Sequence, residues 1–592
     1  MTIQNPTPWA MPRDAKKLMH VALGNTPADL AVVNATLLNV YTGELLKNQS
    51  ISVADKWIAY VGENAQDTIG PETIVIDATG KTVIPGLIDG HTHLGWMCPI
   101  EEYLRYIIPG GTTTIVTETL EPYPVGGLHS VLEFLASLEE QPVKFLATAP
   151  AMASISTQAG HMPIQDLKQL LSYANVVGLG ESYWQNVLQE PDTLLPRFAE
   201  TLACGKILEG HSAGASEKKL NAYIAAGITS CHEPIKADEV LQRLRLGIHV
   251  MAREGSIRRD LKEIAKISRT KVDLRRLVLV TDGIHPEDLL DKGYMEYIVQ
   301  KAIDYGFEPA VAVQMATLNA AEHFGVDHWV GGIAPGRFAD MLLIPDITTI
   351  RPETVISNGR IVFDNNTLMI PPRPHPFSVK SRNSIELSKK FKSGDFALES
   401  VSQSPTATVR AMELITDLVT KEIQLELPLI DGKISISKHQ NLQKIAAIDR
   451  THRPGKTFVG LIKEFGLQSG ALASSSAWDT SDIIVIGAND EDMAVAVNRI
   501  HALQGGYVLC DKGRVVAEVP MPIWGLISEV PIQELVTQLS SLKAALADRG
   551  VPFPDPLLTI ITLTGAAIPF LRICEDGYVN LKNGTTHGID VL

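Results

Sequence analysis

Between residues 85 and 305, short apolar runs alternate eight times with longer amphipathic segments. Short apolar runs bounded by turn residues are typical of buried strands, and the longer periodic segments are typical of helices. The predicted strands end near residues 93, 117, 147, 181, 211, 232, 254 and 282. Eight strand–helix units are the number that closes a parallel barrel, so we predict an α/β chain with a (β/α)8 core of the TIM type.

In such a barrel the residues at the carboxyl ends of the strands face one common site. Six of these residues have side chains that bind metals: His91, His93, Glu181, His211, His232 and Asp282. His91 and His93 are two positions apart on a strand and therefore point to the same side. Converging imidazoles are a good half-site for a divalent metal. We expect the set to hold two divalent ions, with Glu181 as the bridging carboxylate.

This expected site has a clear chemistry. A water shared by two such ions has its pKa lowered toward neutrality and becomes a hydroxide nucleophile. Asp282 is then placed to take a proton and pass it to a leaving nitrogen. We regard Asp282, Glu181 and His232 as the catalytic candidates. The alternative, in which each histidine only caps a strand in the core, is disfavoured because all six positions are filled in a chain with 16 histidines.

Composition excludes several other classes of protein. The formal net charge is −15 and no Lys/Arg-rich stripe offsets it, which argues against a nucleic-acid partner. The five cysteines are scattered and form no Cys-x-x-Cys pair, so neither a disulfide framework nor a structural zinc cluster is indicated. No apolar run is long enough to span a bilayer, and residues 1–17 lack the apolar core of a signal peptide. We expect a cytoplasmic protein with no membrane partner.

A chain of 592 residues is too long for one hydrophobic core. Short strands separated by turns indicate a small composite β domain built from residues 1–84 and 326–370. Residues 85–325 form the predicted barrel. A Pro-rich linker at residues 371–376 leads to a C-terminal α/β domain at 377–592, with strands predicted at 483–487, 506–510 and 514–519 and helices at 491–503 and 532–548.

Several motifs carry a resemblance to a known family. They include Pro85-Gly-Leu-Ile-Asp-Gly-His-Thr-His93, Val177-Gly-Leu-Gly-Glu181, Gly210-His-Ser-Ala-Gly214, Met315-Ala-Thr-Leu-Asn-Ala-Ala-Glu-His-Phe-Gly325 and Gly487-Ala-Asn-Asp-Glu-Asp-Met493. Through them the chain resembles the adenine deaminase family of the amidohydrolase superfamily over essentially its whole length. The resemblance implies a barrel flanked by a composite β-sandwich domain and a C-terminal domain. It also implies a binuclear Mn or Fe site that deaminates adenine, with the metal ligands on the same six residues. Zn also accepts such ligands. The resemblance further suggests a homo-oligomer, most simply a dimer.

The sequence departs from the family pattern around the expected substrate. After His-x-His the family reads Ile-Glu-Ser-Ser, whereas this chain reads Leu94-Gly-Trp-Met97 and lacks the carboxylate at Gly95. A family His is replaced by Leu120, and Gly283-Ile284 stand where the family has Asp-Arg. A C-terminal His-Asp-Ser-His-Asn segment has become Trp478-Asp-Thr-Ser-Asp482. The metal ligands are kept while residues around the substrate change.

Five residues are candidates for contact with the substrate: Glu118, Glu121, Trp96, Glu233 and His285. The leading hypothesis is hydrolytic deamination of adenine or a related amino-purine, a small-molecule substrate. The alternative within enzymes is the opening of a cyclic amide or another nitrogen heterocycle. The alternative of another class is a catalytically silent binding protein, which retention of all six ligands disfavours.

Overall fold

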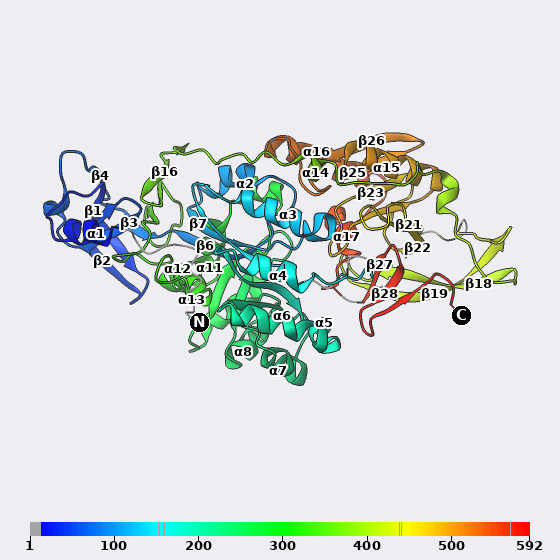
Figure 1. Ribbon diagram of the computed structural model, residues 1–592, viewed down its shortest axis with the longest axis horizontal. Coiled ribbons are helices and arrows are strands. Elements are labelled where there is room, and N and C mark those ends of the chain that lie inside the picture. Colours follow the sequence, from blue (N-terminus) through cyan, green and yellow to red (C-terminus); the bar gives the residue numbers. More distant parts are fainter. Residues whose placement is uncertain are drawn as a thin grey trace.

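The computed structural model describes residues 14–151, 154–157, 160–436, 439, 441–568 and 570–591. At its centre is a ring of parallel strands (Figure 1). These are β6 (Leu87–Thr92), β7 (Thr112–Thr117), β8 (Lys144–Ala149), β9 (Val176–Tyr183), β10 (Ile207–His211), β11 (Ser230–Cys231), β12 (His249–Arg253) and β13 (Leu277–Val280). Every residue of β6, β7 and β8 is buried, as expected for strands that are covered on both faces.

Two backbone hydrogen bonds close the ring where the regular ladders are interrupted. Ladders join β6 through β10 and β11 through β13. Between β10 and β11, the Thr229 N–H donates to the Leu208 carbonyl over 3.0 Å. Between β13 and β6, the Asp282 N–H donates to the His91 carbonyl over 3.0 Å. The core is therefore a TIM-type barrel, and its closing bond joins two candidate metal ligands.

Helices follow the barrel strands in the expected alternation. They are α2 (Ile100–Ile107), α3 (Tyr123–Ser137), α4 (Ile164–Leu171), α5 (Trp184–Gln189), α6 (Pro191–Ala203), α7 (Glu217–Ala225), α8 (Ala237–Arg245), α10 (Pro286–Lys292) and α11 (Met295–Asp304). The seventh unit is shorter than an ordinary helix, with α9 (Leu261–Ile264) followed by the 3-10 turn η2 (Ala265–Arg269). The Asp260 N–H donates to the Arg253 carbonyl, and the two side chains pair at 3.1 Å, which delays the start of this helix.

Residues 309–323 form two helices, α12 (Pro309–Met315) and α13 (Leu318–His323). The carbonyl of Ala316 accepts a hydrogen bond from the Ile88 N–H of β6, at 2.7 Å. The next residue, Thr317, has φ −142° and ψ −92°, which is not helical backbone, so the helix breaks there. The break lets the polypeptide support the strand that carries His91.

A nine-stranded sheet adjoins the barrel, with β1 to β4 at the left in Figure 1. Its strands are β1 (Leu30–Asn39), β2 (Glu44–Ala54), β3 (Trp57–Gly62), β4 (Ile74–Asp77), β5 (Thr82–Pro85), β14 (Met341–Ile344), β15 (Thr354–Ser357), β16 (Arg360–Asp364) and β17 (Thr367–Leu368). Antiparallel pairing of β14 with β5 joins the strands from before the barrel to those from after it. The short helix α1 (Ala15–Ala22) packs beside β3.

The C-terminal part contains a second nine-stranded sheet, ordered β20-β19-β18-β22-β21-β24-β23-β25-β26. The strands are β18 (Thr406–Leu414), β19 (Thr420–Ile430), β20 (Lys433–Ile434), β21 (Leu442–Asp449), β22 (Thr457–Lys463), β23 (Ala471–Ser474), β24 (Asp482–Gly487), β25 (Gly506–Asp511) and β26 (Arg514–Pro520). The strands β27 (Leu571–Cys574), β28 (Gly577–Asn580) and β29 (Thr585–His587) form a small third sheet. The α-helices of this part are α14 (Val379–Arg382), α15 (Asp490–Leu503), α16 (Ile532–Ala547) and α17 (Pro556–Thr562).

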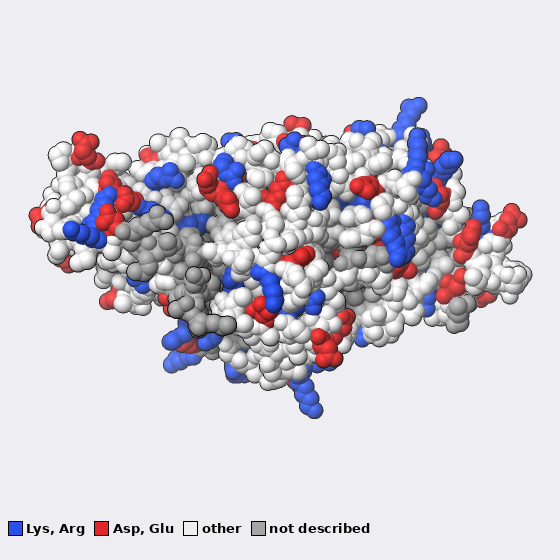
Figure 2. Space-filling view, in the orientation of Figure 1, with Lys and Arg blue, Asp and Glu red and all other residues white. Residues whose placement is uncertain are grey.

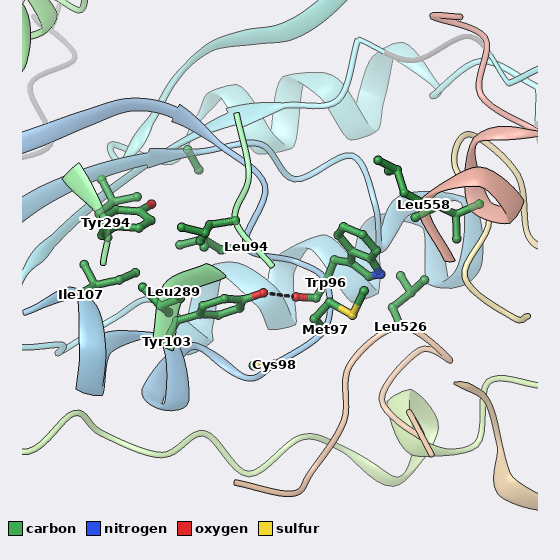
Figure 3. Close-up of a cluster of buried hydrophobic side chains, with 14 of the residues drawn as sticks. Leu94, Trp96, Met97, Cys98, Tyr103, Ile107, Leu289, Tyr294, Leu526 and Leu558 are labelled. Carbon is green, nitrogen blue, oxygen red and sulfur yellow. Dashed lines mark hydrogen bonds between the residues drawn. The ribbon is translucent and has the colours of Figure 1, made fainter. Parts of the chain in front are cut away.

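The segment that follows His93 is fastened to the C-terminal part. Figure 3 shows Trp96 and Met97 packed among apolar side chains, with Leu526 and Leu558 of the C-terminal part beside them. The Tyr103 hydroxyl donates to the Trp96 carbonyl at 2.8 Å, and the Met97 N–H donates to the Leu526 carbonyl at 3.0 Å. The C-terminal part therefore helps to hold the loop that continues from the His-x-His strand.

On the molecular face in Figure 2, acidic and basic side chains are interspersed rather than gathered into one basic patch. Within the described ranges, no helix combines the length and apolar character needed to cross a bilayer.

Candidate metal centre

The structure brings the six predicted metal ligands together at one end of the barrel. His91 lies in β6 and His93 just after it; Glu181 lies in β9, and His211 ends β10. His232 and Asp282 follow β11 and β13. All are buried except His93, whose side chain is 13 % exposed. Donor atoms of His91, Glu181, His232 and Asp282 lie within 4.8 Å of one another.

One carboxylate oxygen, Glu181 Oε1, lies at the centre of the cluster. Four imidazole nitrogens surround it: Nε2 of His91 at 3.3 Å, Nε2 of His93 at 3.6 Å, Nδ1 of His211 at 3.6 Å and Nε2 of His232 at 3.0 Å. His91 and His93 approach this oxygen from β6, whereas His211 and His232 approach it from β10 and β11. A carboxylate between two pairs of imidazoles has the arrangement of a bridging ligand.

Asp282 faces the same pair of histidines. Its Oδ1 lies 3.3 Å from His91 Nε2 and 3.6 Å from His93 Nε2, while its Oδ2 lies 3.2 Å from an Arg253 guanidinium nitrogen. Its backbone adopts a φ of +62°, a region that non-glycine residues rarely occupy. Such a conformation persists only where surrounding contacts determine it, and functional sites are a common place for it.

The electrostatics of the cluster favour bound positive charge. Burial alone would raise the pKa of Glu181, but His211 and His232 outweigh it and hold that pKa well below the usual range. Burial likewise opposes a charge on His91, yet the Asp282 and Glu181 carboxylates, each 3.3 Å from its Nε2, raise the pKa of His91 to about 10. Two ionised carboxylates thus attract cations into a buried site. His91 Nε2 is buried with no hydrogen-bond partner, so this donor set fits a divalent metal.

Two further carboxylates contact the outer nitrogens of the β6 histidines. Glu121 Oε1 lies 2.5 Å from His93 Nδ1, within hydrogen-bond distance. Glu118 Oε1 lies 3.6 Å from His91 Nδ1, and neither Glu118 oxygen has a hydrogen-bond partner. A Cβ atom at Gly95 would lie 3.1 Å from Glu121 Oε2, so the glycine leaves room for this carboxylate. Outer carboxylates of this kind fix the ring orientation of metal-ligating histidines.

The three other predicted substrate residues lie around the same end of the barrel. Glu233 Oε1 lies 3.4 Å from His232 Nε2 and pairs with Arg253. Trp96 contacts His285 edge to face, with ring centroids 5.3 Å apart. His285 Nδ1 lies 3.0 Å from a carboxylate oxygen of Asp555, and its buried Nε2 has no hydrogen-bond partner.

The sequence reasoning missed two residues that connect the centre to the C-terminal part. The Tyr183 ring lies edge to face with His211, with centroids 5.1 Å apart, and its hydroxyl donates to Asp479 at 3.2 Å. Burial raises the pKa of Asp479 to about 7. Tyr183 lies two positions after Glu181, a spacing that places both on one side of a strand and could have identified it. Asp479 lies in the segment 478–482, which departs from the family pattern, but nothing in that segment indicates a contact with Tyr183.

Comparisons with known proteins show what the chain is similar to. The profile of the amidohydrolase family matches residues 82–362, and that of the adenine deaminase C-terminal domain matches residues 417–585. An adenine deaminase of Clostridium botulinum (strain Langeland) is 35% identical over 575 residues, covering 96% of each chain. One from Moorella thermoacetica is 33% identical over 97% of this chain and 98% of its own. A molinate hydrolase structure has a TM-score of 0.46 and 18% identity, and covers 60% of this chain and 98% of that one.

Proposed function

The chain belongs to the adenine deaminase family, and on that premise we propose that it is a metal-dependent hydrolase that converts adenine and water to hypoxanthine and ammonia. In this reaction the bond between C6 of the purine and its amino nitrogen breaks, and a bond from C6 to the water oxygen forms. The observation that carries the proposal is Glu181 Oε1 with four imidazole nitrogens at 3.0–3.6 Å.

We propose that the site holds two divalent cations. His91, His93 and Asp282 would hold one ion and His211 and His232 the other, and Glu181 would contribute to both. Divalent ions in such a site supply, when bound, an acidified water and a positive charge that polarises the substrate. Mn²⁺ or Fe²⁺ is the proposed native pair and Zn²⁺ fits the same ligands, because imidazole and carboxylate donors accept all three.

Asp282 is proposed to move the proton. Burial alone would raise the pKa of Asp282, but His91, His93 and Arg253 outweigh it and hold that pKa well below the usual range. The carboxylate is therefore ionised and able to accept a proton from the attacking water. It then delivers that proton to the departing amino nitrogen, so that ammonia leaves as a neutral molecule. Arg253, which also pairs with Glu233 and Asp260, keeps Oδ2 of Asp282 in place.

The planar base is proposed to lie near the edge-to-face pair of Trp96 and His285, since aromatic rings stack well on purines. Glu118, Glu121 and Glu233 are proposed as the carboxylates nearest the substrate. Asp555 supports this arrangement because its carboxylate lies 3.0 Å from His285 Nδ1, while Nε2 stays free to bond the base.

Ammonium release and the ultraviolet change of adenine, measured with Mn²⁺-loaded protein, test the proposal. We expect conversion to hypoxanthine, and we expect His211→Ala to abolish it while the circular dichroism spectrum is unchanged. The Ala variant removes one of the four nitrogens around Glu181 Oε1. Unchanged turnover in that variant would refute the site assignment, and a metal-replete wild type that leaves adenine intact would refute the substrate.

We further propose that the protein is cytoplasmic and forms a homodimer. We also propose that each chain is divided into the three domains predicted from the sequence. The cytoplasmic location is supported by the five cysteines, all of which are unpaired thiols. The composite domain of residues 1–84 and 326–370 is supported by the pairing of β14 with β5. The oligomer is supported by the family resemblance alone.

A further inference from the structure

A second group of metal-binding side chains lies far along the chain, at the turn between β27 and β28. Ligand atoms of Cys574, Glu575 and Asp576 lie within 4.8 Å of one another. Cys574 and Glu575 are buried, with relative exposures of 0% and 3%. The burial distinguishes this group from the acidic clusters common on protein surfaces, where water solvates the charges.

A fourth side chain, Asp482 at the start of β24, faces this turn. It is 1% exposed, and neither of its carboxylate oxygens has a hydrogen-bond partner. After burial, the charge of Glu575 is the strongest influence that raises the pKa of Asp482. The Glu575 N–H also lies near this carboxylate but does not have hydrogen-bond geometry. Glu575 Oε2 is likewise buried without a partner, whereas its Oε1 accepts from the Ser156 hydroxyl at 2.7 Å.

The nearby cations leave this pair of carboxylates uncompensated. Lys456 pairs with Asp576, so that one carboxylate has its counter-charge. Arg450 is an electrostatic neighbour of Asp482, but its Nη2 donates to two backbone carbonyls instead, at 2.9 and 3.1 Å. Buried carboxylates without an ammonium or guanidinium partner are stable only when they are protonated or bound to a metal.

We propose that Cys574, Glu575 and Asp482, with Asp576 beside them, form a second metal site for a thiophilic divalent cation such as Zn²⁺. A thiolate among carboxylates selects such ions over Mg²⁺ or Ca²⁺. The Cys574 thiol must lose its proton to become a ligand, so metal binding releases a proton to solvent. This site is separate from the barrel centre, where none of the six ligands is a cysteine.

The proposed ion would fasten the C-terminal part to the barrel. The loop after β8 reaches the same turn, where Ser156 donates to Glu575 and the Cys574 thiol lies 3.8 Å from the Ile155 carbonyl. The Ser154 hydroxyl donates to the carbonyl of Asp479, the residue that accepts from Tyr183 beside the barrel centre. A cation at the turn would therefore stabilise the contact between these two parts in a structural role.

Cobalt substitution in the full-length protein tests the proposal. Protein stripped with a chelator is reconstituted with Co²⁺, its metal content is counted by mass spectrometry, and its near-ultraviolet spectrum is recorded. Only a site containing a cysteine gives a thiolate-to-cobalt charge-transfer band. We expect the charge-transfer band in the wild type and in His211→Ala. Cys574→Ser should lose the band and should bind one equivalent of cobalt less than the wild type. Asp482→Asn should weaken cobalt binding at this site at least tenfold.

Cys510→Ser is the matched control, because Cys510 is also a buried thiol of the C-terminal part. It should keep both the band and the full metal content. Circular dichroism of each variant verifies that it is folded. A cobalt-replete wild type without the band, or a band that survives Cys574→Ser, would overturn the proposal. In that case a proton shared by Asp482 and Glu575 accounts for their burial.

Discussion

Glu121→Gln tests the hydrogen bond that orients a candidate metal ligand. Glu121 Oε1 lies 2.5 Å from His93 Nδ1, whereas Glu118 Oε1 lies 3.6 Å from His91 Nδ1. Hydrogen bonds to charged groups contribute about 1.5–3 kcal/mol, and neutral ones about 0.5–1.5 kcal/mol. Glutamine keeps the size and an acceptor oxygen but loses the charge, so about 1–1.5 kcal/mol is lost. That loss corresponds to roughly tenfold weaker metal binding.

The assay is a titration of Mn²⁺ into stripped protein against a competing chelator. Glu118→Gln is the matched control, because it makes the same chemical change beside the other β6 histidine, where the carboxylate has no hydrogen bond to weaken. We expect it to change metal affinity by less than about threefold. If Glu118→Gln weakened binding as much as Glu121→Gln, or if Glu121→Gln changed only the KM for adenine, the orienting role of Glu121 would be refuted.

Three further predictions concern stability. At Gly180 a Cβ atom would lie 2.0 Å from Glu118 Oε2, so Gly180→Ala should destabilise the protein by about 1–3 kcal/mol in urea unfolding. At Gly394 a Cβ atom would have no atom within 4 Å, so Gly394→Ala should change the free energy of unfolding by less than about 0.5 kcal/mol. Equal destabilisation by the two substitutions would contradict the steric explanation. Burial raises the pKa of Glu296 from 4.5 to about 7, so the folded state prefers the neutral acid and stability falls as the pH rises from 4.5 through 7. In Glu296→Gln the loss of unfolding free energy over this pH range should be smaller by on the order of 3 kcal/mol. If the variant and the wild type showed the same pH profile in urea unfolding, a raised pKa of Glu296 would be excluded. Chelation should lower the thermal midpoint and Mn²⁺ should restore it, because the ions bind only the folded chain; equal midpoints would argue against a metal centre.

Much of the barrel could be predicted because each of its strands is marked by residues that are adjacent in the sequence. Each strand is a short apolar run followed by a turn, and the position of His211 or Asp282 relative to that run is read directly from the sequence. The predicted C-terminal strands 483–487, 506–510 and 514–519 correspond to β24, β25 and β26 for the same reason. The strands β18, β19, β21 and β22 were not predicted. β19 has a partly exposed face, and its residues show a weaker apolar run than those of the barrel.

The contacts between distant segments could not be predicted. The bond from Tyr183 to Asp479 joins residues 296 positions apart, and no periodicity encodes such a pairing. Arg253 lies at the end of a predicted strand, but its bonds to Glu233 and Asp282 depend on how three neighbouring strands are aligned. The seventh helix begins only at Leu261, after Asp260 has bonded to Arg253. Long-range packing therefore decides the details that local pattern leaves open.

The most direct test of the account is a titration of metal-free protein with Mn²⁺ under anaerobic conditions, with adenine turnover measured at each step. We expect no turnover without metal and activity that saturates at two equivalents bound in the barrel. We also expect Glu181→Gln, which alters the oxygen surrounded by four imidazole nitrogens, to stay inactive at any metal concentration. Adenine turnover that survives complete metal removal, or full activity in Glu181→Gln, would contradict the account.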